Sequence, residues 1–424
     1  MRILGKSAFA LVALASVALM GLPSGSSLAA ALPQAIRPLR PFAGSPHRGS
    51  LDPSFGNAGK VVTMNAGFSP CPLNAALQPS SKIVVMECAP NNDLQLVRYL
   101  SSGSLDPSFG KGGIGITGLN GDFPTAVTSQ IDGKIVVAAH SNTGAILARF
   151  NSNGTLDPTF GRGGVSAVTP TNVFVGGTAI VELSDGRIVV DAFKGGFQVA
   201  EAFGLARFLP NGALDSTFGK NGLALINTNG FRQVSALAVA LDGTFDALIS
   251  QGSGLPPAYA VHFSANGGFI EAPPSGGLAV NASNPSTAFQ PDAKIVFAQG
   301  AGRNSQQNGR LTRYNSIDPT FLTPAYSFGQ QSGAGITLEP NGGILAGGQG
   351  DNEFALARFN PSGSVDTGFG SGGTVKTPFF TGAGASAGIG VLLLQSDGKI
   401  VAVGGTFNSS TGKSAIALAR YFGP

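Results

Sequence analysis

Residues 132–161 read DGKIVVAAHSNTGAILARFNSNGTLDPTFG, and this stretch predicts a small antiparallel unit of strands and tight turns. An Asp-Gly dipeptide next to an apolar run is a strong hairpin signal, because both residues tolerate the positive φ of a tight turn. Four strands are expected in this unit, at residues 125–130, 134–139, 146–150 and 164–168. No segment after residue 31 sustains a helical period free of Gly and Pro, so the pattern indicates an all-β protein.

Each part of this stretch recurs along the chain. The Leu-Asp-Pro-type turn with its flanking glycines returns at residues 49–56, 103–110, 154–161, 212–219 and 363–370, and in a worn form at 316–321. The segment that resembles Asp-Gly-Lys-Ile-Val-Val begins at Ser81, Asp132, Asp185, Asp242, Asp292, Asn341 and Asp397. The segment that resembles Ala-Leu-Ala-Arg-Phe is centred on Arg98, Arg149, Arg207, His262, Arg313, Arg358 and Arg420. Self-similarity at a period of roughly fifty residues is typical of a propeller or a solenoid.

The order of these segments favours a closed ring. The last unit ends just after Arg420, before its turn and fourth strand, and the missing pieces stand at residues 51–56 and 60–63. An N-terminal strand that completes the last unit leaves no open sheet end, whereas an open β-solenoid explains the repeat but not this offset. The sequence therefore predicts a seven-bladed β-propeller of four-stranded blades, closed by the N-terminal strand completing the last blade.

The combined motifs of residues 132–161 resemble the delta-60 repeat family. The resemblance covers residues 49–422, with departures in the first unit (Ser80-Ser81 instead of Asp-Gly) and in the fourth, which lacks both the Arg and the Leu-Asp-Pro. The resemblance implies a bacterial β-propeller repeat protein, often exported. It implies no general activity, cofactor or catalytic residue.

The first residues have the pattern of an export signal. Arg2 and Lys6 precede an apolar run at residues 8–20, and small residues follow up to Ala31. This is the order of a secretory signal peptide, and the apolar run is too short to span a bilayer comfortably. We expect a signal peptide at 1–31, a Pro-rich entry segment at 32–48 and one propeller domain at 49–424, with no membrane span after cleavage. The protein is then secreted, periplasmic or displayed at the cell surface.

Composition limits the partners. Cleavage would lower the formal net charge from +4 to +2, which is too weak to argue for nucleic acid or an anionic membrane. Charged residues make up 11% of the chain and Gly 63 of its 424 residues, as suits many buried strands and tight turns. We expect a monomer whose partner is an extracellular protein or glycan.

The Arg and Asp residues of the repeat stand eight positions apart. The pairs are Arg98 with Asp106, Arg149 with Asp157, Arg207 with Asp215, and Arg358 with Asp366. In the fourth unit both members are replaced, by His262 and Ile270, and this paired loss predicts contact between them. The Asp before Pro also initiates the turn. The competing interpretation, a repeated calcium site, requires several oxygen donors close together, and each turn carries one.

The two cysteines flank the first unit's inner hairpin. The turn at Ser80-Ser81 places Cys71 and Cys88 roughly opposite each other. Exported proteins usually pair their cysteines, so a disulfide is expected rather than two free thiols.

No catalytic constellation is visible. The chain has three His residues, none close to another, so the spaced ligands of a zinc site are absent, and no metal or other cofactor is expected. Scattered carboxylates select no glycosidase pair. The sequence therefore favours a non-catalytic secreted or cell-surface binding or scaffold propeller. The alternative is an extracellular hydrolase or lyase with an active site assembled across blades.

Loop lengths indicate where a ligand docks. Regular Asp-Gly and Leu-Asp-Pro turns share one face of a propeller, and the loops between second and third strands, which differ most in length, share the other. Binding usually resides in variable loops on a rigid frame, although neutral drift also produces such loops. The candidate ligand-binding residues on that face are aromatic or cationic: His140, Phe193, Lys194, Arg303 and Lys413.

Overall fold

The structure is a computed structural model in which every regular element is a strand within the residues it describes. These residues are 47–64, 73–88, 93–120, 123–141, 144–167, 173–196, 199–227, 232–239, 243–251, 259–271, 286–289, 295–299, 310–314, 335–380 and 384–423. No helix in these ranges could cross a bilayer.

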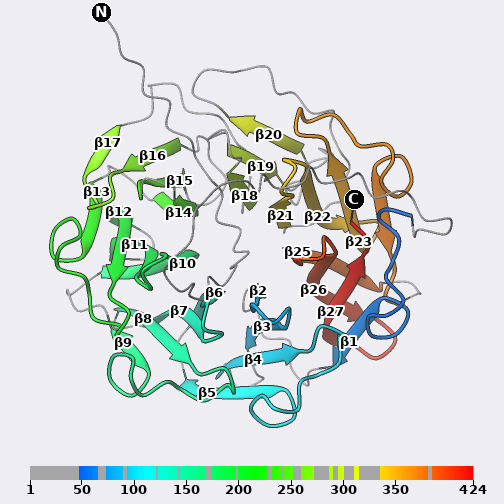
Figure 1. Ribbon diagram of the computed structural model, residues 1–424, viewed down its shortest axis with the longest axis horizontal. Coiled ribbons are helices and arrows are strands. Elements are labelled where there is room, and N and C mark those ends of the chain that lie inside the picture. Colours follow the sequence, from blue (N-terminus) through cyan, green and yellow to red (C-terminus); the bar gives the residue numbers. More distant parts are fainter. Residues whose placement is uncertain are drawn as a thin grey trace, which may run out of the picture.

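Within the described residues, the strands pair antiparallel into six four-stranded sheets and one three-stranded sheet, which Figure 1 shows arranged around a common centre. The first sheet contains β2 (Asn74–Leu77), β3 (Ile83–Cys88), β4 (Asp93–Tyr99) and β5 (Ile114–Asn120). The second contains β6 (Phe123–Ser129), β7 (Ile135–Ser141), β8 (Gly144–Phe150) and β9 (Val165–Ala167). The third contains β10 (Val173–Glu182), β11 (Ile188–Gly196), β12 (Val199–Phe208) and β13 (Leu223–Asn227).

The remaining sheets follow the same order along the chain. The fourth contains β14 (Arg232–Val239), β15 (Phe245–Gln251), β16 (Tyr259–Phe263) and β17 (Phe269–Glu271). The three-stranded fifth contains β18 (Ser286–Phe289), β19 (Ile295–Gln299) and β20 (Arg310–Tyr314). The sixth contains β21 (Gly335–Leu338), β22 (Ile344–Gly350), β23 (Glu353–Phe359) and β24 (Thr374–Thr377). The seventh contains β25 (Ser386–Leu394), β26 (Ile400–Asn408), β27 (Lys413–Tyr421) and, from the opposite end of the chain, β1 (Lys60–Met64).

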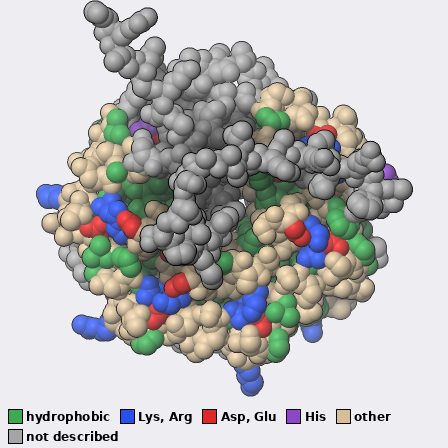
Figure 2. Space-filling view, in the orientation of Figure 1, with side chains coloured by type: hydrophobic (Ala, Val, Ile, Leu, Met, Phe, Trp, Pro, Cys, Tyr) green, Lys and Arg blue, Asp and Glu red, His purple; other side chains and the backbone are tan. Residues whose placement is uncertain are grey.

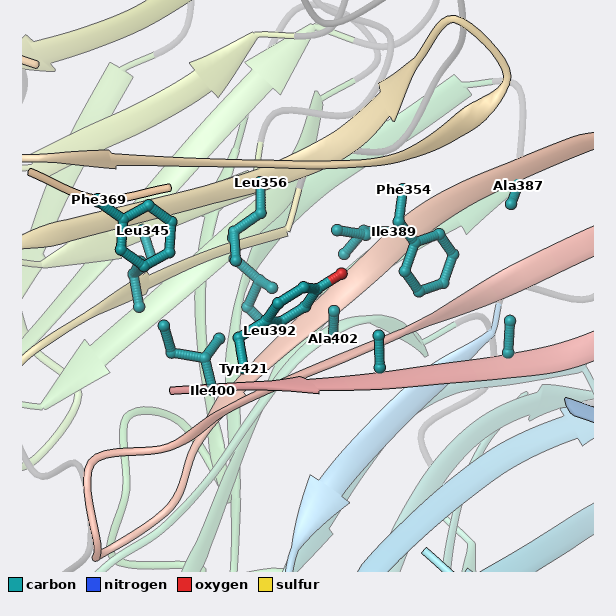
Figure 3. Close-up of a cluster of buried hydrophobic side chains, with 12 residues drawn as sticks. Leu345, Phe354, Leu356, Phe369, Ala387, Ile389, Leu392, Ile400, Ala402 and Tyr421 are labelled. Carbon is teal, nitrogen blue, oxygen red and sulfur yellow. The ribbon is translucent and has the colours of Figure 1, made fainter. Parts of the chain in front are cut away.

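The core lies between neighbouring sheets. Each buried apolar cluster combines side chains from two adjacent sheets, as Figure 3 shows for Leu356 of β23, Ile389 of β25 and Ala402 of β26. The second strand of a unit is therefore buried on both faces: Val136, Val137 and Ala138 of β7 are all 0% exposed. Burial on both faces explains why these strands read as continuous apolar runs instead of alternating patterns.

The turns follow the chemistry of their residues. Gly133, of the Asp-Gly turn, has φ +82°, and Gly154, before the Leu-Asp-Pro turn, has φ +89°. A Cβ on Gly133 would meet nothing within 4 Å, whereas a Cβ on Gly154 would lie 2.9 Å from the Phe109 ring of the preceding sheet. Gly154 is thus required both for its backbone conformation and for the close approach of two sheets.

These two glycines make a matched pair for a stability test. We expect Gly133→Ala to lower the free energy of unfolding by about 1 kcal/mol, because only the positive φ is disfavoured. Gly154→Ala should cost about 2–4 kcal/mol, because it adds a clash with a buried ring. Urea unfolding followed by circular dichroism measures both. Equal losses in the two variants would show that the contact with Phe109 relaxes without cost.

Candidate functional site

Several residues of the repeat come together in an Arg–Asp cluster, which the second sheet shows completely. In the second sheet, Arg149 on β8 donates from Nε to Asp157 Oδ2 at 2.8 Å. Its Nη2 donates to Thr159 Oγ1 at 3.2 Å, and its Nη1 donates to the backbone oxygen of Pro210 in the third sheet at 2.6 Å. The guanidinium lies 4.6 Å from the centroid of the Phe160 ring. One side chain thus ties its own turn to the next sheet.

The aspartate of the cluster accepts from several donors at once. Asp157 Oδ1 accepts from the backbone N of Thr159 at 3.0 Å and from its hydroxyl at 2.7 Å, while Lys134 Nζ lies 3.3 Å from Oδ2. Burial alone raises the pKa of this carboxyl, but the hydrogen bonds from Thr159 and the charges of Lys134 and Arg149 outweigh it and lower the pKa well below its usual range. Asp157 therefore stays ionised and is a structural acceptor.

The same geometry recurs in three other sheets. The distances from Arg Nε to Asp Oδ2 are 2.9 Å for Arg98–Asp106, 2.7 Å for Arg207–Asp215 and 2.9 Å for Arg420–Asp52. Each guanidinium also lies against a Phe ring and donates to a backbone oxygen of the neighbouring sheet, as Arg207 does to Ala265 at 2.6 Å. Figure 2 shows acidic and basic side chains side by side at several positions around the visible face.

The Arg420–Asp52 cluster could not be read from a spacing of eight, because its members are 368 positions apart. The signal for it was the circular offset of the repeat. Lys399 Nζ lies 3.3 Å from Asp52 Oδ2, as Lys134 does from Asp157, so the cluster is complete although its residues come from both ends of the chain.

The sixth sheet carries a rearranged cluster. Arg358 Nε donates to Glu339 Oε2 at 2.9 Å, while its Nη1 contacts Asp366, which also receives Arg48. Gly343 occupies the position of the Lys that approaches Asp157 in the second sheet. Compared with the second sheet, this cluster gains the carboxylate of Glu339 and lacks the ammonium of the Lys. Arg48 supplies Asp366 with a second cation. The structure therefore brings Arg358 and Asp366 together, but with Glu339 as an additional partner that the sequence pattern did not indicate.

The fourth sheet has no such cluster. His262 on β16 stands in the Arg position, and its Nδ1 contacts Asp246 Oδ1 on β15. Ile270, in the Asp position, is 57% exposed. A local His–Asp contact thus stands where the first, second, third and seventh sheets have an Arg that reaches the next sheet.

The structure describes the side chains of three of the five predicted ligand-binding residues. His140 lies near the end of β7, but its side chain is outside the described residues, and so is Arg303. Phe193 is partly buried and Lys194 exposed near the end of β11, and Lys413 is the exposed first residue of β27. Each of the described positions lies at the end of a sheet where second and third strands are joined.

One further residue at this end was missed by the sequence reasoning. Phe407 on β26 is 37% exposed and pairs with Ser414, next to the Asn408–Lys413 pair. Its signal was a large apolar residue at the end of an otherwise polar hairpin.

The candidate cysteine pair is not placed. Cys71 lies outside the described residues, and only the backbone of Cys88, at the end of β3, is described. The disulfide stays a prediction.

Within the described ranges, no three His, Cys, Asp or Glu side chains gather in a way that could hold a metal ion. The carboxylates of the repeated turns are instead taken up by Arg, Lys, Ser and Thr, as at Asp52, where Arg420 and Ser54 both donate.

Known proteins agree with this architecture. Residues 78–109, 130–160, 183–218, 339–369 and 395–422 match the family described as "Domain of unknown function (DUF5122) beta-propeller". No curated protein matches the sequence.

Two solved structures are similar to this chain, and the first supports the fold. The BP39L lectin from Burkholderia pseudomallei matches at a TM-score of 0.54 and 14% identity, covering 84% of this chain and 98% of that one. A streptogramin B lyase matches at a TM-score of 0.46 and 12% identity, covering 84% and 96%. At such identities the likeness concerns the fold and not the ligand. The matched repeats and the antiparallel sheets set around one centre place this chain in a β-propeller repeat family.

Proposed function

We propose that the chain forms a seven-bladed ring closed by its N-terminal strand, as delta-60 repeats would. The proposal is supported by the pairing of β1 with β27, in which Lys60 stands opposite Ala419 and Met64 opposite Ala415. The first strands of successive sheets contact one another, and β2 also contacts β25. Tyr99 of the first sheet donates to Thr63 of β1 at 2.7 Å, which joins that sheet to the last one.

On this frame, we propose a non-catalytic binding or scaffold protein, exported by its leader and acting as a monomer outside the cytoplasm. The observation that carries the proposal is the contrast between the two ends of the sheets. At one end the Asp-Gly and Leu-Asp-Pro turns are fixed by the Arg–Asp clusters. At the other end two hairpins have longer described strands than the hairpins of the second and sixth sheets, and their described residues at that end take no part in the clusters.

These hairpins are β11–β12 and β26–β27. Strands β11 and β26 each have 9 residues, against 7 in β7 and β22. Each longer hairpin carries an aromatic and a lysine side chain at this end: Phe193 with Lys194, and Phe407 with Lys413. Aromatic and ammonium groups at the same end of the sheets suit an extracellular protein or glycan that carries acidic groups. His140 and Arg303 belong to the same proposed surface.

Charge reversal tests this surface. The probe is the partner captured from an extracellular extract or a glycan array. Lys194→Glu combined with Arg303→Glu should weaken its binding about tenfold or more, because both substitutions place repulsive charge at the contact. Lys413→Glu should add to the loss. Titration by surface plasmon resonance at two salt concentrations measures the effect.

The matched control reverses Lys111 and Lys220, two exposed lysines in the turns at the opposite end of their sheets. This double variant changes the net charge by the same amount as Lys194→Glu/Arg303→Glu and should bind the partner normally. Loss of binding in the control, together with normal binding in Lys194→Glu/Arg303→Glu, would contradict the proposal and place the ligand on the face that carries the Asp-Gly and Leu-Asp-Pro turns. Turnover of the captured ligand would replace the binding role with a hydrolase or lyase.

A further inference from the structure

The fourth sheet differs from its neighbours at one aligned pair of positions. In the sheets with an Arg–Asp cluster, the Arg on the third strand stands opposite an apolar residue of the second strand, as Arg149 does opposite Val136 and Arg207 opposite Val189. Val136 and Val189 are 0% exposed. In the fourth sheet His262 stands opposite Asp246, so a carboxylate occupies the apolar position.

The pair is asymmetric in its exposure. The side chain of Asp246 is 8% exposed and that of His262 is 43% exposed. A carboxylate this deeply buried needs a cation or strong hydrogen-bond donors. In the neighbouring sheets an Arg would supply a permanent charge, whereas His supplies a full charge only when its imidazole is protonated.

Among the residues that the structure describes, no second ion pair gives Asp246 another cation. The position of Lys134 is taken here by Thr244, and the position of Asp157 by Ile270. Glu271 pairs with His262 in the backbone register of β16 with β17, and its side chain is outside the described residues. Arg207 of the third sheet reaches this unit at the Ala265 backbone oxygen, but its Nε is bound to Asp215.

We propose that the His262–Asp246 pair makes the stability of the fourth sheet pH-dependent. The pair holds β15 and β16 together strongly when the imidazole is protonated and weakly when it is neutral. An adjacent carboxylate favours the protonated imidazole, so the folded protein binds this proton more tightly than the unfolded chain. The stabilisation is therefore complete at pH values below the ordinary imidazole pKa of about 6.5, and it is lost as the pH rises above that value through the higher pKa of the folded protein. The sheets with an Arg–Asp cluster lack this dependence because Arg stays charged throughout.

Hydrogen exchange measured by mass spectrometry on the full chain tests the proposal. Between pH 5.5 and pH 8, after correction for the intrinsic exchange rate, protection of β15 and β16 should fall about threefold to tenfold. Protection of β7 and β8 should stay constant. His262→Gln should remove the pH dependence, because the amide is neutral throughout. His262→Arg should remove it as well and keep β15 and β16 protected at pH 8.

His140→Gln is the matched control, since it removes a histidine from the second sheet and should leave the behaviour of β15 and β16 unchanged. If His262→Gln folds poorly, the pH dependence of exchange in His262→Arg still tests the proposal. A pH dependence that survives in His262→Arg, or that is absent from the unsubstituted protein, would overturn the proposal.

Discussion

Arg149→Ala should lower the free energy of unfolding by about 3 kcal/mol or more, because it removes one member of a buried ion pair and leaves the other without compensation. Asp157 is 2% exposed and, among the described residues, would retain only Lys134 as a cationic partner. The Pro210 backbone oxygen would lose its donor, and Phe160 would lose the guanidinium that covers it. The loss therefore extends across the junction of the second and third sheets.

Urea unfolding followed by far-ultraviolet circular dichroism is the appropriate measurement, since the chain has no Trp. Arg162→Ala is the matched control, because Arg162 is exposed in the turn before β9 and should change stability by less than about 0.5 kcal/mol. Arg149→Lys should fall between the two, because Lys keeps the charge but cannot reach three acceptors. A loss in Arg149→Ala no larger than in Arg162→Ala would refute a stabilising role for the cluster.

Acidification should unfold the protein between about pH 4 and pH 2, because the cluster carboxylates bind protons less readily when folded. Burial raises the pKa of Asp52, but the Ser54 hydroxyl and backbone N–H, the charge of Arg420 and the contact with Lys399 outweigh it and lower the pKa to about 2. The pKa values of Asp106, Asp157, Asp215 and Asp366 are lowered as well.

An unfolded aspartate has a pKa near 3.9, so the unfolded chain takes up protons first as the pH falls. Stability from the clusters is complete above about pH 4 and is lost as the pH approaches about 2. Equilibrium unfolding in urea at each pH measures this loss.

Asp52→Asn isolates one cluster. The variant should be less stable at neutral pH, because Arg420 loses its carboxylate, and it should lose less further stability between pH 4 and pH 2. Asp397→Asn is the control, since Asp397 is half-exposed beside the same Lys399. If Asp52→Asn kept the unsubstituted protein's slope of stability against pH, the cluster carboxylates would not govern acid unfolding.

The local elements were predictable because each depends on residues close together in the chain. Apolar runs and Asp-Gly turns indicated the second sheet, and β6, β7, β8 and β9 overlap the four predicted strands. The structure extends β6 and β8 toward the end that lacks these turns, and it starts β7 one residue after Lys134. These differences reflect register with neighbouring strands, which the sequence of one segment does not encode.

The candidate site was predictable in part for the same reason. Arg149 and Asp157 lie on one strand and the turn after it, so a fixed spacing brings them together. The bond from Arg149 to Pro210 spans 61 positions, and no local motif specifies it. Phe407 was missed because its exposure depends on how far β26 and β27 extend together.

By itself, the sequence determined the repeat, the all-β class and the turn chemistry, because tight turns and buried strands require particular residues at fixed local spacings. Only the tertiary structure decided the partners that cross between sheets, such as the Pro210 carbonyl bound by Arg149 and the Ala265 carbonyl bound by Arg207. Those contacts depend on the packing angle and separation of sheets, which arise from the burial of many apolar side chains together. The spacing of residues along the chain therefore does not predict these contacts.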